Sequence, residues 1–294
     1  QTCALPIWKR LRPVLCVLTA EALGGEVEQA LPFACAIELM HNFALVHDDI
    51  EDGDEVRRDR PSVWVKYGAA NGINIGDYLL CKVYGTLIDQ ATLPPTTRLE
   101  LLKLMTDTLD HTIVGQALEI SARDQRTFSH EEYIRLVREK TAHYLAAPMI
   151  GGAIVAGADH GVINALESFG HFVGPLFQIT DDLLDLTAGK GRGGAIGSDI
   201  REGKRSFLVA ETVSQASDED RKMLFGILDK PRDETSDEDV ETVIGMYEKY
   251  RAIEKARSYS EELLEKALAE LRHLPAPLEG PLAVFARQIV SRDR

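Results

Sequence analysis

The chain is dominated by apolar residues that recur at spacings of three and four, the period of an α-helix with a buried face. Runs in which apolar and polar residues alternate, as in a half-buried strand, are almost absent. The helical spacing covers residues 31–52, 73–87, 96–121, 130–158, 162–186, 204–215, 239–271 and 278–291. These runs predict long antiparallel helices, with a kink at Pro148 in the fourth, and therefore an all-α protein.

Polar segments separate the predicted helices. Residues 53–62 form an arginine-rich connection that contains Pro61, and residues 187–198 are rich in glycine without an apolar period. We expect the second of these segments to be a mobile loop. Residues 217–220 and 236–239 are acidic, and each begins with a serine that an acid follows three residues later. That spacing is typical of a helix N-cap, so we expect these segments to cap helices and not to form sites.

Composition limits the partners of such a protein. With 294 residues, 45% of them hydrophobic, the chain can bury a substantial core and suits one large domain or two small ones. Its formal net charge of −14 argues against nucleic acid as the main partner, because phosphate backbones are bound by basic surfaces. A phosphate ligand must therefore be bound by local groups.

Cysteine usage and the longest apolar run indicate the compartment. The four cysteines show neither paired metal-ligand spacing nor the density of a disulfide scaffold, so we expect a reducing compartment, the cytoplasm. The longest apolar stretch, residues 145–158, is shorter than the roughly 18 residues that a membrane-spanning helix needs. Pro148 and several glycines interrupt it, and no membrane span is predicted.

The start of the sequence is unusual. Residues 1–7 resemble the translation of a sequencing-adaptor oligonucleotide, and they lack the basic and apolar regions of a signal peptide. We expect them to be a non-native tail, with native sequence beginning near Trp8 or Lys9 and the N-terminal helix truncated. The alternative is a genuine short N-terminal segment.

Two aspartate clusters stand out in the predicted helices. The clusters consist of Asp48, Asp49 and Asp52, and of Asp181, Asp182 and Asp185. In each cluster the first and last aspartates are four residues apart, so they project from one helix face and repel each other. A hard divalent cation relieves this repulsion, and Mg²⁺ commonly bridges carboxylates to substrate phosphates. The clusters therefore predict a magnesium site with a phosphorylated ligand.

Basic residues occur where a phosphate would need them. They are Lys9, Arg12, Arg57, Arg58, Lys140 and Lys204. Neighbouring arginines offer a fork geometry that suits phosphate oxygens. One aspartate cluster alone could be a solvated helix end, and each basic residue alone is better explained as a surface charge. The prediction of a site depends on their combination.

These residues resemble the trans-isoprenyl diphosphate synthases, the polyprenyl synthetase family that includes farnesyl and geranylgeranyl diphosphate synthases. The resemblance runs in order from Lys9 to about Ser206. One signature is LVHDDIED at residues 45–52, followed by Arg57-Arg58, and the other is GPLFQITDDLLD at residues 174–185. Further family blocks are similar to residues 115–119, 140–141 and 197–204.

The resemblance implies a fold and a metal content. It implies one domain over residues 1–294, a single large bundle of long antiparallel helices around a central cavity, as in the isoprenoid synthase fold. It also implies three Mg²⁺ ions that clamp an allylic diphosphate, with Asp48, Asp52 and Asp181 as direct ligands. Supporting contacts through water and second-layer hydrogen bonds are implied for Asp49, Asp182 and Asp185.

The resemblance also implies the substrate contacts. Arg57, Lys140 and Lys204 resemble the basic residues that bind the allylic diphosphate. The residues that resemble the isopentenyl diphosphate pocket are Lys9, Arg12, His41 and Arg58. Polar groups that face the developing carbocation correspond to Thr141 and Gln178.

The implied reaction follows from charge. Magnesium and basic residues stabilise the departing diphosphate, so the allylic C–O bond ionises and the double bond of isopentenyl diphosphate attacks the cation. We expect the released diphosphate to take the proton, since no histidine or carboxylate is obviously placed as a base. The cation needs a water-free pocket, for which the loop at residues 188–197 is the expected lid. The resemblance further implies a homodimer.

The sequence departs from the family pattern at several positions. Asp59 stands where a glycine or histidine usually follows the arginine pair, which puts an acid beside phosphate-binding groups. Ala195 stands about where some members carry a lysine, and Lys190 or Arg192 could substitute for it. The Gly-Gly pair that is expected before Lys9 is absent. These departures concern the isopentenyl site and the loop.

The product length is predicted from two residues. In the family, a bulky aromatic residue five positions before the first aspartate shortens the product cavity. Phe43 holds that position, with the small Ala44 next to it, and the pattern resembles a geranylgeranyl (C20) synthase. Phe43 could equally be ordinary core packing, and a farnesyl (C15) or longer product stays open.

Three other functions would require different sequence features. A class I terpene cyclase would carry an Asn/Ser/Glu metal motif in place of the second aspartate cluster. A noncatalytic partner subunit would be expected to have lost an aspartate cluster or the Arg57-Arg58 pair. A di-iron helical bundle would need Glu-x-x-His pairs on its core helices. The sequence carries both aspartate clusters and the arginine pair, and it favours a prenyltransferase.

Overall fold

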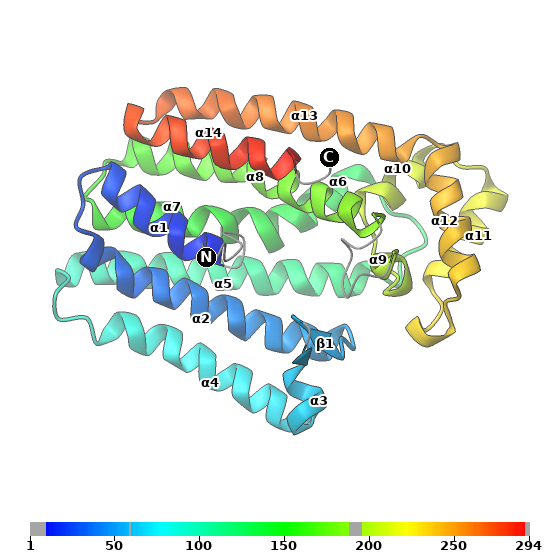
Figure 1. Cartoon of the computed structure of the whole chain (residues 1–294), viewed down its shortest axis with the longest axis horizontal. Helices are drawn as coiled ribbons and strands as arrows, with labels where there is room; N and C mark the ends of the chain where they lie inside the picture. The colour runs from blue at the N-terminus through cyan, green and yellow to red at the C-terminus, as the bar shows by residue number, and fades with distance from the viewer. Residues whose placement is uncertain (1–9, 59, 188–195, 292–294) are drawn as a thin grey trace, which may run out of the picture. The chain divides into compact units, whose positions relative to one another are not determined.

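The computed structural model describes residues 10–58, 60–187 and 196–291, and these residues are mostly helical (Figure 1). The all-α prediction is therefore confirmed. The expected tail at residues 1–7, Lys9 and most of the expected lid loop lie outside the described residues. The chain divides into two compact units, one of Gln1–Leu109, Tyr144–Glu167 and Leu271–Pro281, the other of Asp110–His143, Ser168–Glu270 and Leu282–Arg294.

Helices from both ends of the sequence build the first unit. Its elements include α1 (Leu11–Ala22), α2 (Val27–Glu51), β1 (Val56–Arg57), β2 (Arg60–Pro61), α3 (Val63–Tyr67), α4 (Ala69–Ile88) and most of α7 (His143–Val155). Helices α2 and α4 run side by side (Figure 1). Their apolar faces enclose a core that includes Phe33, Ile37, Met40 and Leu87. Helix α1 was not among the predicted helices.

Close backbone contacts hold α7 in the first unit. A Cβ added to Gly151 would lie 2.1 Å from the ring of buried Phe33, and one added to Gly152 would lie 2.2 Å from the carbonyl oxygen of Cys16. Both distances are shorter than real carbon contacts. The glycines therefore let α7 approach α1 and α2 more closely than a side chain would allow.

The connection after α2 contains a short hairpin. The predicted polar segment at residues 53–62 includes the antiparallel pair β1–β2, in which Val56 faces Pro61 and Arg57 faces Arg60. Arg58 lies between the two strands with φ of 55°, in the left-handed region that non-glycine residues rarely adopt. Neither short strand has an alternating apolar pattern, so neither strand could be predicted from the sequence.

The second unit is built around the helix that carries the second aspartate cluster. Its elements include α6 (His130–Val137), η2 (Arg138–Ala142), α9 (Ser198–Arg201), α10 (Phe207–Gln215), α11 (Asp218–Leu228), η4 (Arg232–Glu234), α12 (Asp237–Lys249) and α13 (Ala252–Glu270). Helices α5 (Pro95–Ala122), α8 (His160–Asp185) and α14 (Ala276–Ser291) contribute to both units. The η5 turn (Leu271–His273) belongs to the first unit.

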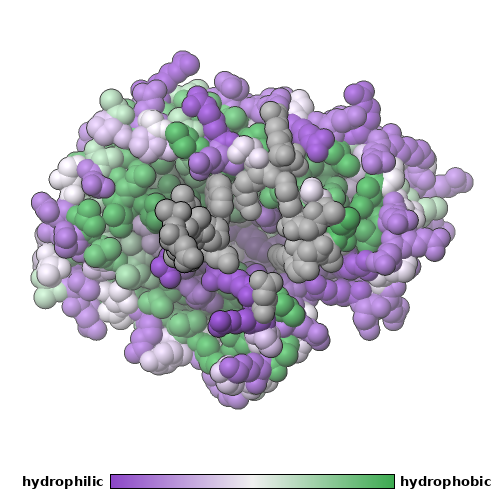
Figure 2. Space-filling model, viewed as in Figure 1, coloured by the Kyte–Doolittle hydropathy of each residue, from purple (hydrophilic) through white to green (hydrophobic). Residues whose placement is uncertain are grey.

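The predicted caps are present in the second unit. The Ser217 side chain accepts a hydrogen bond from the backbone N–H of Asp220 at the start of α11. Ser236 and Asp239 form a reciprocal capping box at the start of α12. Hydrophilic residues cover most of the visible surface in the region of α11 and α12 (Figure 2). Both acidic segments therefore cap helices, as predicted.

The predicted run at residues 130–158 is not one regular helix. Five residues, Arg138–Ala142, form a π-helix between α6 and α7, and the backbone N–H of His143 donates to the carbonyl oxygen of Arg138. Helix α7 continues through Pro148. π-Helical turns often occur at functional sites, and this one contains the predicted site residues Lys140 and Thr141.

One helix among the described residues, α2, is long and apolar enough to cross a membrane by composition. Half of its most apolar window is buried inside the protein. Buried core helices pass the same test, and α2 supplies much of the first unit's core.

The close contact at Gly151 can be tested by substitution. Gly151→Ala should lower the free energy of unfolding by about 1–3 kcal/mol, because the added methyl group overlaps the Phe33 ring. Urea denaturation followed by circular dichroism measures the change. Gly85→Ala in α4 is the matched control, because no atom lies within 4 Å of its added Cβ. The control should be neutral or stabilising by up to about 1 kcal/mol, and equal effects at both positions would contradict the close contact.

Candidate active site

The first aspartate cluster occupies the C-terminal end of α2. Asp49 is 2% exposed, and its Oδ1 accepts a hydrogen bond of 2.7 Å from Nε of Arg57 and a second one from Nη2. Asp48 and Asp52 are half-buried. The cluster therefore consists of one buried carboxylate that is paired with an arginine and two half-buried carboxylates.

Arg57 has a defined position because two acids hold it. Besides Asp49, its Nη2 contacts Oδ2 of Asp54 at 3.4 Å, and Asp54 is itself buried. The backbone N–H of Asp54 donates to the carbonyl oxygen of Asp49, which fixes the turn after α2. The family resemblance implies that Arg57 binds the diphosphate, but it did not predict that Asp49 holds the Arg57 side chain.

Three of the four residues predicted for the isopentenyl pocket are electrostatically linked in the first unit. Burial, together with the positive charges of Arg12, Arg58 and Arg57, lowers the pKa of His41 to about 3. The guanidinium of Arg12 lies 4.2 Å from the centre of the Tyr144 ring. His41 is therefore neutral at neutral pH beside several cations, a setting that favours an anionic ligand. Lys9, the fourth residue, lies outside the described residues.

Phe43 and Ala44 lie one to two turns before the first aspartates on α2. Phe43 is buried in the core of the first unit, and Ala44 packs against that core. The Phe43 ring meets the ring of His47 edge-on, with centroids 4.8 Å apart. His47 in turn packs on Gly76 of α4, where an added Cβ would lie 2.1 Å from it. His47, which is itself held against α4, therefore restricts the position of the Phe43 ring.

The second cluster, like the first, contains a buried acid that pairs with a basic side chain. Asp182 is 2% exposed and accepts hydrogen bonds from Tyr133 Oη at 3.0 Å, Gln178 Nε2 at 3.1 Å and Lys204 Nζ at 3.0 Å. Burial raises the pKa of Asp182, and the nearby charge of Lys204 opposes that shift. Asp181 is half-buried. Sequence reasoning missed Tyr133, whose place on an amphipathic helix carried no signal beyond core packing.

Asp185 has a structural partner. Its two carboxylate oxygens accept hydrogen bonds from the backbone N–H groups of Ser198 and Asp199, at 3.2 and 3.0 Å. Burial, together with the negative charge of Asp199, raises the pKa of Asp185 to about 7. Asp199 also binds Lys204 Nζ at 2.9 Å. Asp185 and Asp199 therefore position the segment that presents Lys204.

Lys140 and Thr141 lie on the π-helix η2. Lys140 forms an ion pair with Glu119 of α5, and Thr141 Oγ1 lies 3.4 Å from Gln178 Oε1. A Cβ added to Gly115 would lie 2.3 Å from the backbone nitrogen of Lys140, so α5 and η2 are in direct backbone contact. Glu119 belongs to a family block in the sequence, but it was not among the predicted site residues.

Glu119 is ionised although it is buried. Burial alone would raise its pKa, but Lys140, Lys204 and Arg123 lower it to about 2. The buried carboxylate and the lysine therefore keep each other charged.

The donor atoms suit magnesium. The half-buried aspartates Asp48, Asp52 and Asp181 offer hard oxygen ligands, which Mg²⁺ prefers. Among the buried aspartates, Asp49 pairs with Arg57 and Asp182 pairs with Lys204, whereas Asp185 accepts hydrogen bonds from backbone N–H groups. Each cluster thus combines carboxylates for a cation with cationic side chains that could meet an anion.

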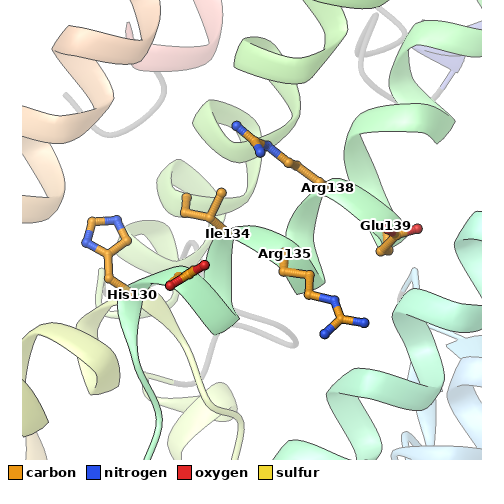
Figure 3. Close-up of a pocket in the computed structure, with 6 residues that line it drawn as sticks. His130, Ile134, Arg135, Arg138 and Glu139 are labelled. Carbon is orange, nitrogen blue, oxygen red and sulfur yellow. The ribbon is translucent and has the colours of Figure 1, made fainter.

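The second unit also has a pocket of about 540 Å³ outside the aspartate cluster (Figure 3). Its lining residues are His130, Glu131, Ile134, Arg135, Arg138 and Glu139. None of the predicted site residues is among them.

Comparison with known proteins establishes the family. Residues 6–247 match the polyprenyl synthetase family. The short chain isoprenyl diphosphate synthase of Methanothermobacter thermautotrophicus is 34% identical over 287 residues, which are 97% of this chain and 86% of that protein. This chain belongs to the polyprenyl synthetase family. The resemblance inferred from the two signatures is confirmed, and the reaction class is that of a trans-prenyl diphosphate synthase.

Solved structures agree with the family assignment. The geranylgeranyl pyrophosphate synthetase of Pyrococcus horikoshii is 34% identical, with a TM-score of 0.87 over 96% of this chain and 86% of that one. A geranylgeranyl pyrophosphate synthase from Corynebacterium glutamicum, solved with isoprenyl diphosphate and magnesium, is 28% identical with a TM-score of 0.87 over the same shares. The described fold is therefore the isoprenoid synthase fold.

The charge on Glu119 predicts a pH dependence. Glu119→Gln should lower the free energy of unfolding at pH 7 by about 1–3 kcal/mol, because Lys140 loses its ionic partner. Because the pKa of Glu119 is lowered on folding, its ionised carboxylate stabilises the folded state at pH values above 4.5, the ordinary pKa of a glutamate. This stabilisation is lost as the pH falls from 4.5 toward 2. The difference between the two proteins should therefore shrink between pH 4.5 and pH 2. Urea midpoints measured across this range test it, and a difference that does not change with pH would contradict an ionised Glu119.

Proposed function

We propose that this enzyme condenses isopentenyl diphosphate with an allylic diphosphate, head to tail, to give a trans-polyprenyl diphosphate, with geranylgeranyl diphosphate (C20) as its main product. One observation carries the proposal. In both aspartate clusters a buried acid holds a basic side chain, and at least one further aspartate of the cluster is half-buried. Aspartates that only capped or solvated a helix end would not need buried basic partners.

Each basic residue in the proposed diphosphate site is oriented by an acid. Asp49 holds Arg57, Glu119 holds Lys140, and Asp182 holds Lys204. Pairing fixes the side chains before the substrate arrives, so little reorganisation is needed when charge develops on the departing diphosphate. Asp48, Asp52 and Asp181 would hold Mg²⁺, with Asp49, Asp182 and Asp185 behind them. Bound Mg²⁺ would supply Lewis-acid stabilisation of the leaving group, and we propose three ions per site.

The chain's other residues have separate tasks. Arg12, neutral His41 and Arg58, together with Lys9, would bind isopentenyl diphosphate. Thr141 and Gln178 would direct their oxygens toward the allylic cation, without a group basic enough to trap it. The proton lost after carbon–carbon bond formation would pass to the released diphosphate.

Product length is the finest part of the proposal. Relatives of similar identity are named short chain and geranylgeranyl synthases, so the names alone leave several lengths. The buried Phe43 ring, held edge-on by His47, is the proposed floor of the product cavity. We further propose that the enzyme is a homodimer and acts in the cytoplasm.

The reaction is tested with purified protein, Mg²⁺, isopentenyl diphosphate and dimethylallyl, geranyl or farnesyl diphosphate. Chromatography of the dephosphorylated products should show elongated prenyl alcohols, and chelation of Mg²⁺ should abolish them. Asp48→Asn and Asp181→Asn should each lower the rate by at least about 100-fold, because metal ligands are lost. The exposed Asp233→Asn is the matched control and should retain the wild-type rate.

Two results would overturn the proposal. An absence of elongated products with all three allylic substrates would exclude the condensation, and cyclic hydrocarbons in their place would indicate a terpene cyclase. Full activity of both aspartate variants would exclude the assigned metal sites.

Phe43→Ala tests the product length. Removing the ring should lengthen the main product beyond C20, because the space that it fills becomes available to the growing chain. Chromatographic sizing measures the shift. Leu93→Ala is the control for loss of core packing, since Leu93 is buried in the same core. An unchanged product from a folded Phe43→Ala protein would show that another residue sets the length.

A further inference from the structure

Two histidines and a glutamate form a second cluster of potential metal ligands in the second unit. His111 lies on α5, Glu139 lies on η2 and His143 begins α7. Their ligand atoms all lie within 4.8 Å of one another. His111 Nδ1 lies 2.6 Å from Glu139 Oε2, and the rings of His111 and His143 stack with centroids 3.8 Å apart. None of the three belongs to the aspartate clusters or to the residues of the proposed reaction.

The backbone brings these side chains together. Gly115 touches the backbone of Lys140, and His111 precedes Gly115 by one helical turn on the same face of α5. His111 therefore faces the stretch that contains Glu139 and His143. These two residues are four positions apart on one continuous helical segment, the spacing that places side chains on a common face.

The chemistry of the cluster differs from that of the aspartates. Two imidazole nitrogens and one carboxylate oxygen are the ligand set of many tetrahedral zinc sites, which complete their coordination with water. Mg²⁺ prefers oxygen ligands and retains its waters, so it would compete poorly here. The side chains of His111 and Glu139 are 39% and 26% exposed, so an ion can reach them from solvent.

We propose that His111, Glu139 and His143 bind one divalent transition-metal ion of the zinc type, separately from the magnesium of the reaction. Tetrahedral zinc needs its ligand atoms about 3.3 Å apart, so the stacked rings must turn until their nitrogens converge beside Glu139. A bound ion would join α5 to η2, the segment that carries Lys140. The other explanation is that the His–Glu pair and the ring stack only pack these helices together.

Zinc binding distinguishes the two explanations. The 294-residue chain is freed of metal and titrated with Zn²⁺ against a chromophoric chelator, with Mg²⁺ in large excess. One Zn²⁺ should bind per chain. His143→Ala should weaken Zn²⁺ binding by at least about tenfold. Loss of a residue that only hydrogen-bonds to a metal ligand already weakens metal binding by about tenfold or more, and loss of a ligand itself should cost at least as much. His111→Ala and Glu139→Gln should each weaken binding similarly.

His273→Ala is the matched control, because His273 is an exposed histidine outside the cluster, and it should bind Zn²⁺ as the wild type does. A further imidazole, His171, lies edge-on to His143 at 5.3 Å and could add a ligand, so His143 is the residue whose loss decides the test. Glu139→Gln keeps the size of the side chain and serves if a histidine variant fails to fold. An absence of zinc binding, or equal affinity in the wild type and all three cluster variants, would overturn the proposal.

Discussion

A carboxylate buried in an apolar helix must be paired, and the pairing of Asp182 organises the second unit. Tyr133, Gln178 and Lys204 all donate hydrogen bonds to it, and they come from three separate helical or turn segments. Without these partners an ionised group at 2% exposure would cost several kcal/mol. The need to satisfy one buried charge therefore draws together the residues that the proposed reaction uses.

The first unit solves the same problem with different residues. Asp49 pairs with Arg57, and the neighbouring Asp48 and Asp52 keep some exposure. In each cluster one aspartate positions a cationic side chain, so the three aspartates of a motif are not equivalent. Neighbouring aspartates repel one another and would destabilise an isolated helix. Inside the protein, pairing of one aspartate with a basic side chain offsets part of this repulsion.

The long helices and the serine caps could be predicted from the sequence because they depend on local spacing. The π-helix at Arg138–Ala142 could not, since its apolar period continues into the flanking helices. Tyr133 and Glu119 were missed for a related reason: each acts through a partner that is distant in sequence. The aspartates were found because repeated acids on an apolar helix are conspicuous before any contact is known.

The π-helix also restricts how this segment can change in length. Each residue of an α-helix turns the chain by about 100°, so deleting one residue from Arg138–Ala142 would rotate everything that precedes it relative to everything that follows. Lys140 would then no longer face Glu119, and the backbone contact with Gly115 would be lost. Substitutions can be absorbed one side chain at a time, whereas an insertion or deletion here would displace several partners at once. The segment therefore acts as a fixed spacer whose residue count matters more than most of its side chains.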